Sequence, residues 1–136
     1  MSKKILIADD EPSIVAAVEF LLQRNGYEVS IARNGDEALD LIERSHPDLV
    51  LLDVMMPRKS GYEVCARMRE RPDWRDIKII MLSARGRDAE VNRGLTAGAD
   101  VYVIKPFSTR ELMAKISDLL DPGAADGNDA GLGQIR

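Results

Sequence analysis

Several polar residues of the chain follow short apolar segments and could together carry out phosphoryl transfer. They are two carboxylates after the first segment, one after the third, a hydroxyl after the fourth and an ammonium after the fifth: Asp9, Asp10, Asp53, Ser83 and Lys105. Crowded carboxylates repel one another, and Mg²⁺ accepts a few carboxylates together with water as ligands. A carboxylate beside Mg²⁺ can attack phosphorus while the metal ion and an ammonium neutralise the transferring group. These residue types predict Asp53 as a phosphoacceptor, with Lys105 as the cation beside it.

Each of these residues has an ordinary structural interpretation when it is taken alone. The acidic pair Asp9-Asp10 could only favour the dipole of a following helix, and Asp53 could be a turn residue. Ser83 could cap a helix, and Lys105 could be a solvated turn lysine. None of these interpretations explains why all the groups follow predicted strands at the same end, so the joint pattern favours a site.

Five apolar segments predict the strands that would position these residues. They are Lys4–Ala8, Glu28–Ala32, Leu49–Leu52, Ile77–Leu82 and Val101–Ile104. The third and fourth segments are apolar without alternation, as expected for strands covered on both faces of a parallel sheet. We therefore expect helices on both sides of the sheet.

The segments between these strands have the spacing of amphipathic helices, as in Ile14 to Leu22, Ala38 to Ile42 and Leu112 to Leu120. The alternation of strand and helix predicts an α/β fold, a doubly wound (βα)5 sandwich of flavodoxin-like type. We expect a five-stranded parallel sheet in the order 2-1-3-4-5. Strands 1 and 3 are neighbours in that order, so Asp9, Asp10 and Asp53 would meet at the carboxyl edge, where ligands bind in such sheets.

Length and composition indicate one folded domain. With 136 residues, 45% of them hydrophobic and 31% charged, the chain can bury one core and has the composition of an ordinary globular protein. We expect the domain to cover residues 1–121. Residues 122–136, rich in Gly, Ala and Asp, are predicted to form a flexible C-terminal tail or linker.

Charge and hydrophobicity argue against several other classes of protein. The net charge of −4 argues against a nucleic-acid-binding surface, which needs clustered Lys and Arg. The N-terminus does not read as a secretory signal, and no apolar run approaches the length of a membrane span. The single cysteine, Cys65, excludes an internal disulfide framework. These features predict a cytoplasmic protein that contacts neither membrane nor nucleic acid directly.

Five short motifs occur in a fixed order between Lys3 and Leu120. They are Asp9-Asp10, the run Leu49-Val50-Leu51-Leu52-Asp53-Val54-Met55-Met56-Pro57, Ser60-Gly61, Ser83-Ala84 and Lys105-Pro106-Phe107. Each motif alone is a weak signal, whereas the ordered set is highly specific. Together they resemble the receiver (REC) domain of two-component response regulators.

The resemblance implies a role for each matching residue. Asp53 would accept the phosphoryl group as an aspartyl phosphate, and Asp9 and Asp10 would hold Mg²⁺ together with Asp53. The backbone carbonyl of Met55 would be a further metal ligand. Lys105 would pair with the phosphoryl group.

The resemblance also implies a conformational switch. Ser83 would hydrogen-bond a phosphoryl oxygen, and Tyr102 would be the aromatic residue that changes rotamer as Ser83 moves. An aromatic residue in a strand is more often packed in a core, and this interpretation of Tyr102 stays open. The bond between Lys105 and Pro106 is expected to be cis.

A receiver domain of this kind takes its phosphoryl group from a sensor histidine kinase or a phosphotransfer protein. It would be a regulatory phosphoprotein that catalyses its own phosphorylation and dephosphorylation rather than an enzyme with a separate substrate. Phosphorylation would switch the face made by the fourth helix, the fifth strand and the fifth helix. That face would bind a downstream effector or output domain, or form a phosphorylation-dependent homodimer. The chain could be a stand-alone receiver or one joined to an output domain through a linker.

Two alternative functions are compatible with the same fold. A Mg²⁺-dependent phosphohydrolase of the haloacid dehalogenase type also uses an aspartate at a strand end, but its Asp-x-Asp signature is absent because Met55 follows Val54. A phosphorylation-independent protein-interaction module would keep the fold without the chemistry. The intact Asp10, Asp53 and Lys105 argue against that second alternative.

Other conspicuous residues are expected to be structural. Cys65 would be a small core residue, His46 a loop residue and Trp74 a loop residue without an assigned role. Arginines interleaved with acidic residues are expected to form solvated faces; they include Arg67, Arg69, Arg71 and Arg75.

Overall fold

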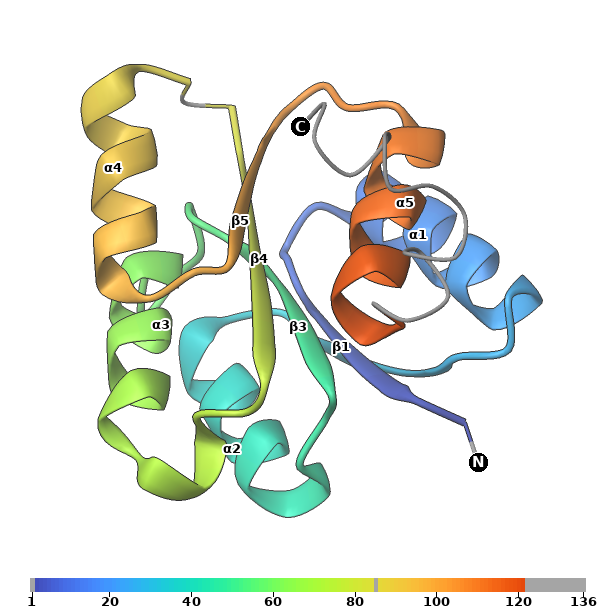
Figure 1. Cartoon of the computed structure of the whole chain (residues 1–136), viewed down its shortest axis with the longest axis horizontal. Helices are drawn as coiled ribbons and strands as arrows, with labels where there is room; N and C mark the ends of the chain where they lie inside the picture. The colour runs from blue at the N-terminus through green and yellow to red at the C-terminus, as the bar shows by residue number, and fades with distance from the viewer. Residues whose placement is uncertain (1, 85, 122–136) are drawn as a thin grey trace.

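The computed structural model describes residues 2–84 and 86–121. Strands and helices alternate along the chain (Figure 1), as the apolar segments predict. The elements in chain order are β1 (Lys4–Ala8), α1 (Pro12–Arg24), β2 (Glu28–Ala32), α2 (Gly35–Ser45), β3 (Leu49–Asp53), α3 (Gly61–Glu70), the short 3-10 helix η1 (Pro72–Trp74), β4 (Lys78–Ser83), α4 (Asp88–Ala97), β5 (Val101–Ile104) and α5 (Thr109–Leu120).

The five strands form one parallel sheet in the order β2-β1-β3-β4-β5, which confirms the predicted fold. Strand β1 lies between β2 and β3 and pairs with both. In the register between β1 and β3, Ala8 lies opposite Leu52. The chain segments that follow these two residues therefore emerge side by side at the carboxyl edge of the sheet.

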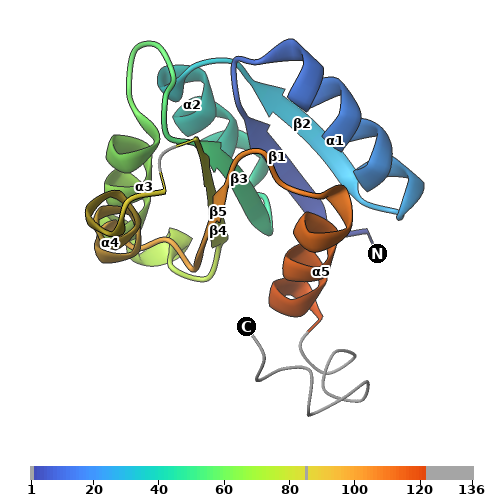
Figure 2. The ribbon, with the colours of Figure 1, turned by 90° about the horizontal axis from the view of Figure 1, so that it is seen from above.

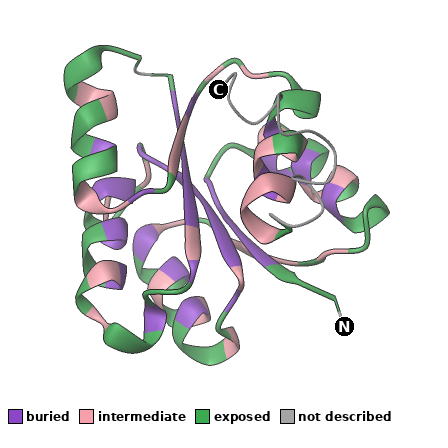
Figure 3. Cartoon of the chain, in the orientation of Figure 1, coloured by how far each residue is buried: buried purple, intermediate pink, exposed green. Residues whose placement is uncertain are grey.

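Helices cover both faces of the sheet, with α1 and α5 on one face and α2, α3 and α4 on the other (Figure 2). Successive side chains of a strand point to opposite faces, and β3 supplies both layers. Leu49 and Leu51 pack with α1 and α5, whereas Val50 and Leu52 pack with α2 and α3. The uniformly apolar sequence of β3 follows from this double burial, and the buried strands contrast with the exposed outer sides of the helices (Figure 3).

Two strands end one residue later than the sequence suggests. Asp53 is the last residue of β3 and Ser83 the last residue of β4, whereas the apolar pattern places each just after its strand. The register explains the difference, since Asp53 pairs with Leu82 and Ser83 pairs with Ile104. Their backbones thus extend the ladder while their polar side chains lie at its edge.

Local capping signals start several helices where the sequence indicates. The Ser60 side chain accepts a hydrogen bond from the Glu63 N–H, and the Glu63 carboxylate accepts one from the Ser60 N–H, a complete capping box at the start of α3. The Ser108 side chain accepts the Glu111 N–H at the start of α5. Trp74, predicted to lie in a loop, lies in the short helix η1 and is buried in the core.

The predicted C-terminal tail or linker, residues 122–136, lies outside the described residues. Among residues 2–84 and 86–121, no helix is both long enough and apolar enough to cross a membrane.

Candidate metal and phosphoacceptor site

Three carboxylates gather at the carboxyl edge of the sheet. Asp9 and Asp10 lie in the turn between β1 and α1, and Asp53 ends the neighbouring strand β3. One oxygen from each carboxylate lies within 4.8 Å of the other two. Asp9 is completely buried and Asp53 is 4% exposed, whereas Asp10 is exposed. The cluster is therefore accessible to solvent on the side of Asp10 and shielded from it on the side of Asp9 and Asp53.

Lys105 reaches the same cluster from the end of β5. Its Nζ atom lies 3.4 Å from Oδ2 of Asp9, 3.4 Å from Oδ1 of Asp53 and 3.2 Å from Oε1 of Glu11. The lysine side chain is 14% exposed, so these interactions are partly shielded from water. One ammonium thus offsets part of the negative charge of several acidic groups.

The environment changes the pKa values of both members of the central pair. Burial, reinforced by the negative charge of Asp9, raises the pKa of Asp53 from its ordinary 3.8 to about 6, against the opposing effect of Lys105. Burial alone would lower the pKa of Lys105, but the surrounding carboxylates outweigh it and the net shift is upward. The lysine stays protonated at neutral pH, and ionisation of Asp53 is less favourable than that of a solvent-exposed aspartate.

Backbone groups fix the two buried carboxylates. The Glu11 N–H donates to Oδ1 of Asp9 at 2.9 Å, and the Met55 N–H donates to Oδ1 of Asp53 at 3.3 Å. Gly61 passes so close that a Cβ atom there would lie 2.4 Å from the Asp53 carbonyl oxygen. The β3–α3 loop is therefore folded back tightly against the aspartate that ends β3.

Ser83 ends β4 and Lys105 directly follows the neighbouring strand β5 at the same edge. The Lys105 N–H donates to the Ser83 carbonyl at 2.7 Å, and Ser83 is buried. The peptide bond between Lys105 and Pro106 is cis. The structure therefore places Ser83 and Lys105 with the three aspartates, all at one edge of the sheet.

Tyr102 lies elsewhere, on the face of β5 that packs against α3 and α4. Its ring touches Gly94, where a Cβ atom would come within 2.8 Å of it. Burial, reinforced by the neighbouring Tyr102 hydroxyl, raises the pKa of Tyr62 to about 12, and the Tyr62 hydroxyl donates to the Glu90 carbonyl at 3.2 Å. In this structure Tyr102 belongs to the helix-covered layer rather than to the carboxylate cluster.

The donor set of the cluster suits a hard divalent cation. Its exposed and buried carboxylate oxygens are the ligand type that such cations prefer, and they lie close enough together to share one ion.

Residues 5–117 match the family described as the response regulator receiver domain. The chain belongs to this family. It is a receiver domain of the kind found in two-component signalling.

Individual relatives agree with this membership. The chain is 45% identical over 120 residues to the phosphate regulon transcriptional regulatory protein PhoB of Rhizobium meliloti, covering 88% of this chain and 53% of that protein. Its structure resembles a CheY-like receiver domain protein from Methanospirillum hungatei, with a TM-score of 0.82, 34% identity and coverage of 93% and 99% of the two chains.

A second solved structure is the BeF3-activated N-terminal receiver domain of RstA from Klebsiella pneumoniae. The TM-score is 0.81 at 29% identity, over 88% of this chain and 99% of that one. The chain spans about half the length of the curated relatives it matches.

Some residues around the site are not singled out by sequence reasoning. Glu11 contacts Lys105, and the only signal for it is that it extends the acidic run after β1. Arg69 is not part of a solvated face as the charge pattern suggests. Its side chain is 20% exposed and donates to the carbonyls of Gly98, Trp74, Arg75 and Ile77, which lie at the end of α4 and in the segment from η1 to β4.

Proposed function

We infer that Asp53 accepts a phosphoryl group from the phosphohistidine of a sensor histidine kinase or phosphotransfer protein, in a Mg²⁺-dependent reaction. The observation that carries this inference is the placement of the buried Asp53 carboxylate beside the buried Asp9 and the partly buried ammonium of Lys105, which contacts both. Together with a divalent cation at the carboxylates, Lys105 would stabilise the negative charge of an added phosphoryl group. The receiver domain would then be a regulatory phosphoacceptor that supplies the groups for its own phosphorylation and dephosphorylation.

The transfer step uses the ionised form of Asp53. One carboxylate oxygen forms the new bond to phosphorus, and the bond between phosphorus and the histidine nitrogen breaks. The leaving imidazole keeps the bonding electron pair and takes a proton from water. Because the pKa of Asp53 is about 6, the nucleophile is mostly ionised at neutral pH even before a cation binds.

Asp9, Asp10, Asp53 and the carbonyl of Met55 are the groups that would hold Mg²⁺. The bound ion supplies positive charge that neutralises the phosphoryl oxygens during transfer. Lys105 would contribute the second positive charge from just after β5, at the same edge of the sheet, where it already contacts Asp53. Removal of the charge on Asp53 by phosphorylation would leave Lys105 to pair with the phosphoryl group.

Signalling would follow from a shift between two conformations. Ser83 would bond a phosphoryl oxygen, and its backbone contact with Lys105 would couple both residues to the end of β5. Tyr102, in the same strand, would change its contacts with α4. The face made by α4, β5 and α5 would then bind an effector or output domain, or a second copy of the chain. Cytoplasmic localisation stays a prediction from the sequence.

Phosphorylation with a small acyl phosphate donor tests the proposal. We expect Mg²⁺-dependent incorporation of phosphate into the wild-type chain and none into Asp53→Asn, with Asp40→Asn as a control on the exposed surface of α2. Beryllofluoride, present in the activated RstA receiver domain, is expected to bind the wild type and not Asp53→Asn. Equal labelling of Asp53→Asn would overturn the assignment of the phosphoacceptor. Sustained hydrolysis of phosphate esters would favour a phosphohydrolase instead.

A further inference from the structure

The loop between β3 and α3 is held from outside the site by the first turn of α2. This loop carries Met55, whose carbonyl is a proposed metal ligand, and it ends at Ser60, the first residue of the α3 capping box. In Figure 2 the loop lies beside the start of α2. The contacts between these two segments have no role in the chemistry described above.

Close packing of the backbone makes the first contact. The Gly35 N–H donates to the Pro57 carbonyl at 3.3 Å. A Cβ atom on Gly35 would lie 2.5 Å from both the Cβ atom and the carbonyl oxygen of Lys59. Any larger residue at position 35 would have to displace the loop backbone, since the carbonyl oxygen cannot rotate away as a side chain can.

An ion pair makes the second contact. The Lys59 Nζ atom lies 2.8 Å from Oδ1 of Asp36, and the lysine side chain is only 25% exposed. This interaction lowers the pKa of Asp36 through the hydrogen bond from Lys59. The guanidinium of Arg58 lies 4.0 Å from the other oxygen of the same carboxylate.

The loop needs such support because its own backbone is irregular. Arg58 has a φ of 74°, in the left-handed region that non-glycine residues rarely adopt. Within the loop, the Lys59 N–H bonds the Pro57 carbonyl at 2.9 Å, and the Gly61 N–H bonds the Val54 carbonyl at 2.9 Å. These bonds close the loop on itself, while the contacts from Gly35 and Asp36 fix where the closed loop sits.

We propose that Gly35, Asp36 and Lys59 are positioning residues for the divalent-cation site. They hold the β3–α3 loop so that the Met55 carbonyl is presented to the ion that the three aspartates bind. This inference rests on the proposed function, because it needs a cation at that cluster. It assigns to α2, which contributes no ligand, a part in setting the affinity for Mg²⁺.

The chain offers a matched control on the same helix. Asp40 and Arg44 form an ion pair of 2.8 Å within α2, and their side chains are 62% and 64% exposed. Asp36→Asn and Asp40→Asn each remove one carboxylate charge from α2 and so change the long-range field similarly. Only Asp36→Asn releases Lys59.

Calorimetric titration with Mg²⁺ tests the proposal. We expect Asp36→Asn and Lys59→Met each to weaken Mg²⁺ binding about two- to fivefold, the range that the loss of one such pair supports. The double variant should be no weaker than either single variant, because both act through one contact. Asp40→Asn should bind like the wild type, and Gly35→Ala should weaken binding more than either charge variant.

Hydrogen exchange without any metal supplies a second measurement. Amides of the loop from Met55 to Ser60 should exchange faster in Asp36→Asn and Lys59→Met, whereas amides of β1 and β3 should not change. The inference is overturned if Asp36→Asn binds Mg²⁺ as tightly as Asp40→Asn, or if the effects of the two single variants simply add. Absence of Mg²⁺ binding by the wild type would instead refute the proposed function itself.

Discussion

Lys105 and Asp53 are 52 residues apart in the sequence, yet Nζ of the lysine lies 3.4 Å from Oδ1 of the aspartate. The contact joins the ends of β5 and β3, which are separated in the sheet by β4. Lys105 shares its charge with Asp9 and Glu11, so no carboxylate is fully compensated. The protein therefore holds an electrostatically unfavourable cluster at the edge where a cation is proposed to bind.

The raised pKa of Asp53 predicts a pH-dependent effect of its removal. A carboxyl with a folded-state pKa of about 6 and an ordinary value of 3.8 favours the folded state below pH 4, and this contribution is lost as the pH rises through 6. Without divalent cations, Asp53→Asn should raise the free energy of unfolding by about 1–2 kcal/mol at pH 7.5 and much less at pH 4.5. Urea denaturation at both values measures this, and equal effects at both would contradict it.

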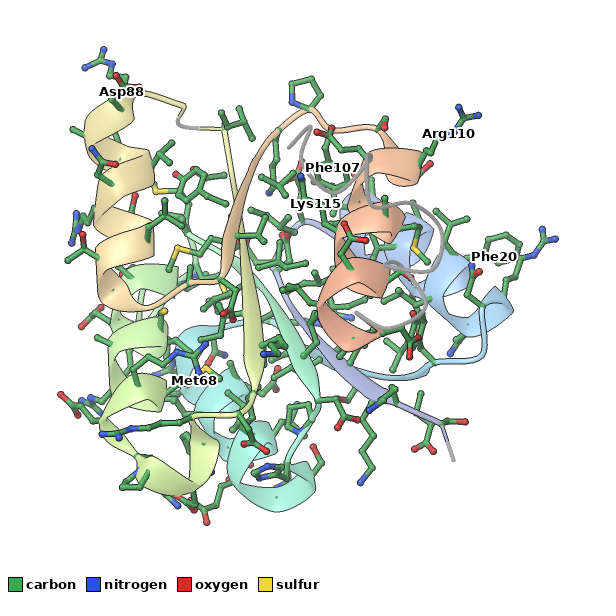
Figure 4. All side chains as sticks on the ribbon, viewed as in Figure 1. Phe20, Met68, Asp88, Phe107, Arg110 and Lys115 are labelled. Carbon is green, nitrogen blue, oxygen red and sulfur yellow. The ribbon has the colours of Figure 1, made fainter. Side chains whose placement is uncertain are left out.

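A bound divalent cation should stabilise the receiver domain. Ligand binding to the folded state alone contributes about 2.7 kcal/mol at a hundredfold excess over the dissociation constant. We expect Mg²⁺ to raise the melting temperature of the wild type and to have little effect on Asp10→Asn, whose exposed side chain is not needed for folding. Asp88→Asn, an exposed residue in the first turn of α4 (Figure 4), is the control and should keep the full Mg²⁺ effect.

The contact of Gly94 with Tyr102 predicts an overpacked variant. A methyl group at position 94 would lie 2.8 Å from the Tyr102 ring and 2.9 Å from Sδ of Met81. Gly94→Ala should lower the free energy of unfolding by about 1 kcal/mol, because crowding outweighs the better helix propensity of alanine. In a Tyr102→Ala background the same substitution should be neutral or stabilising. A double-mutant cycle in urea measures the coupling, and additive effects would show that the ring does not restrict this position.

The interactions of Arg69 predict a large loss of stability far from the site. Its guanidinium bonds the carbonyls of Gly98 and Ile77 at 2.9 Å each and pairs with Asp100 at 3.1 Å. Arg69→Met should lower the free energy of unfolding by about 2–4 kcal/mol, since it removes the donor to the Gly98 and Ile77 carbonyls and leaves Asp100 without its guanidinium partner. Arg67→Met, on the exposed side of the same helix, should change it by less than about 0.5 kcal/mol. Chemical denaturation of the two variants compares them directly; similar losses would contradict this account.

The sequence by itself determined the order of the elements and the edge where the polar residues gather. Uniformly apolar runs such as Leu49–Leu52 identify doubly covered strands, and the parallel order places the residues after β1 and β3 side by side. Both conclusions depend on local patterns and on topology. The sequence could predict them because hydrophobic periodicity and strand order are properties of whole helices and strands and do not depend on any single side-chain contact.

Only the tertiary structure decided how individual side chains pair. Glu11 reaches Lys105, Arg69 is half-buried among carbonyl groups, and Lys59 of the β3–α3 loop pairs with Asp36 in the first turn of α2. A charged residue in a helix or loop has the same local signal whether it is solvated or buried. Its partner and its pKa depend on which helix ends, strand ends and loops pack around it. Those neighbours are determined only when the helices pack against the sheet.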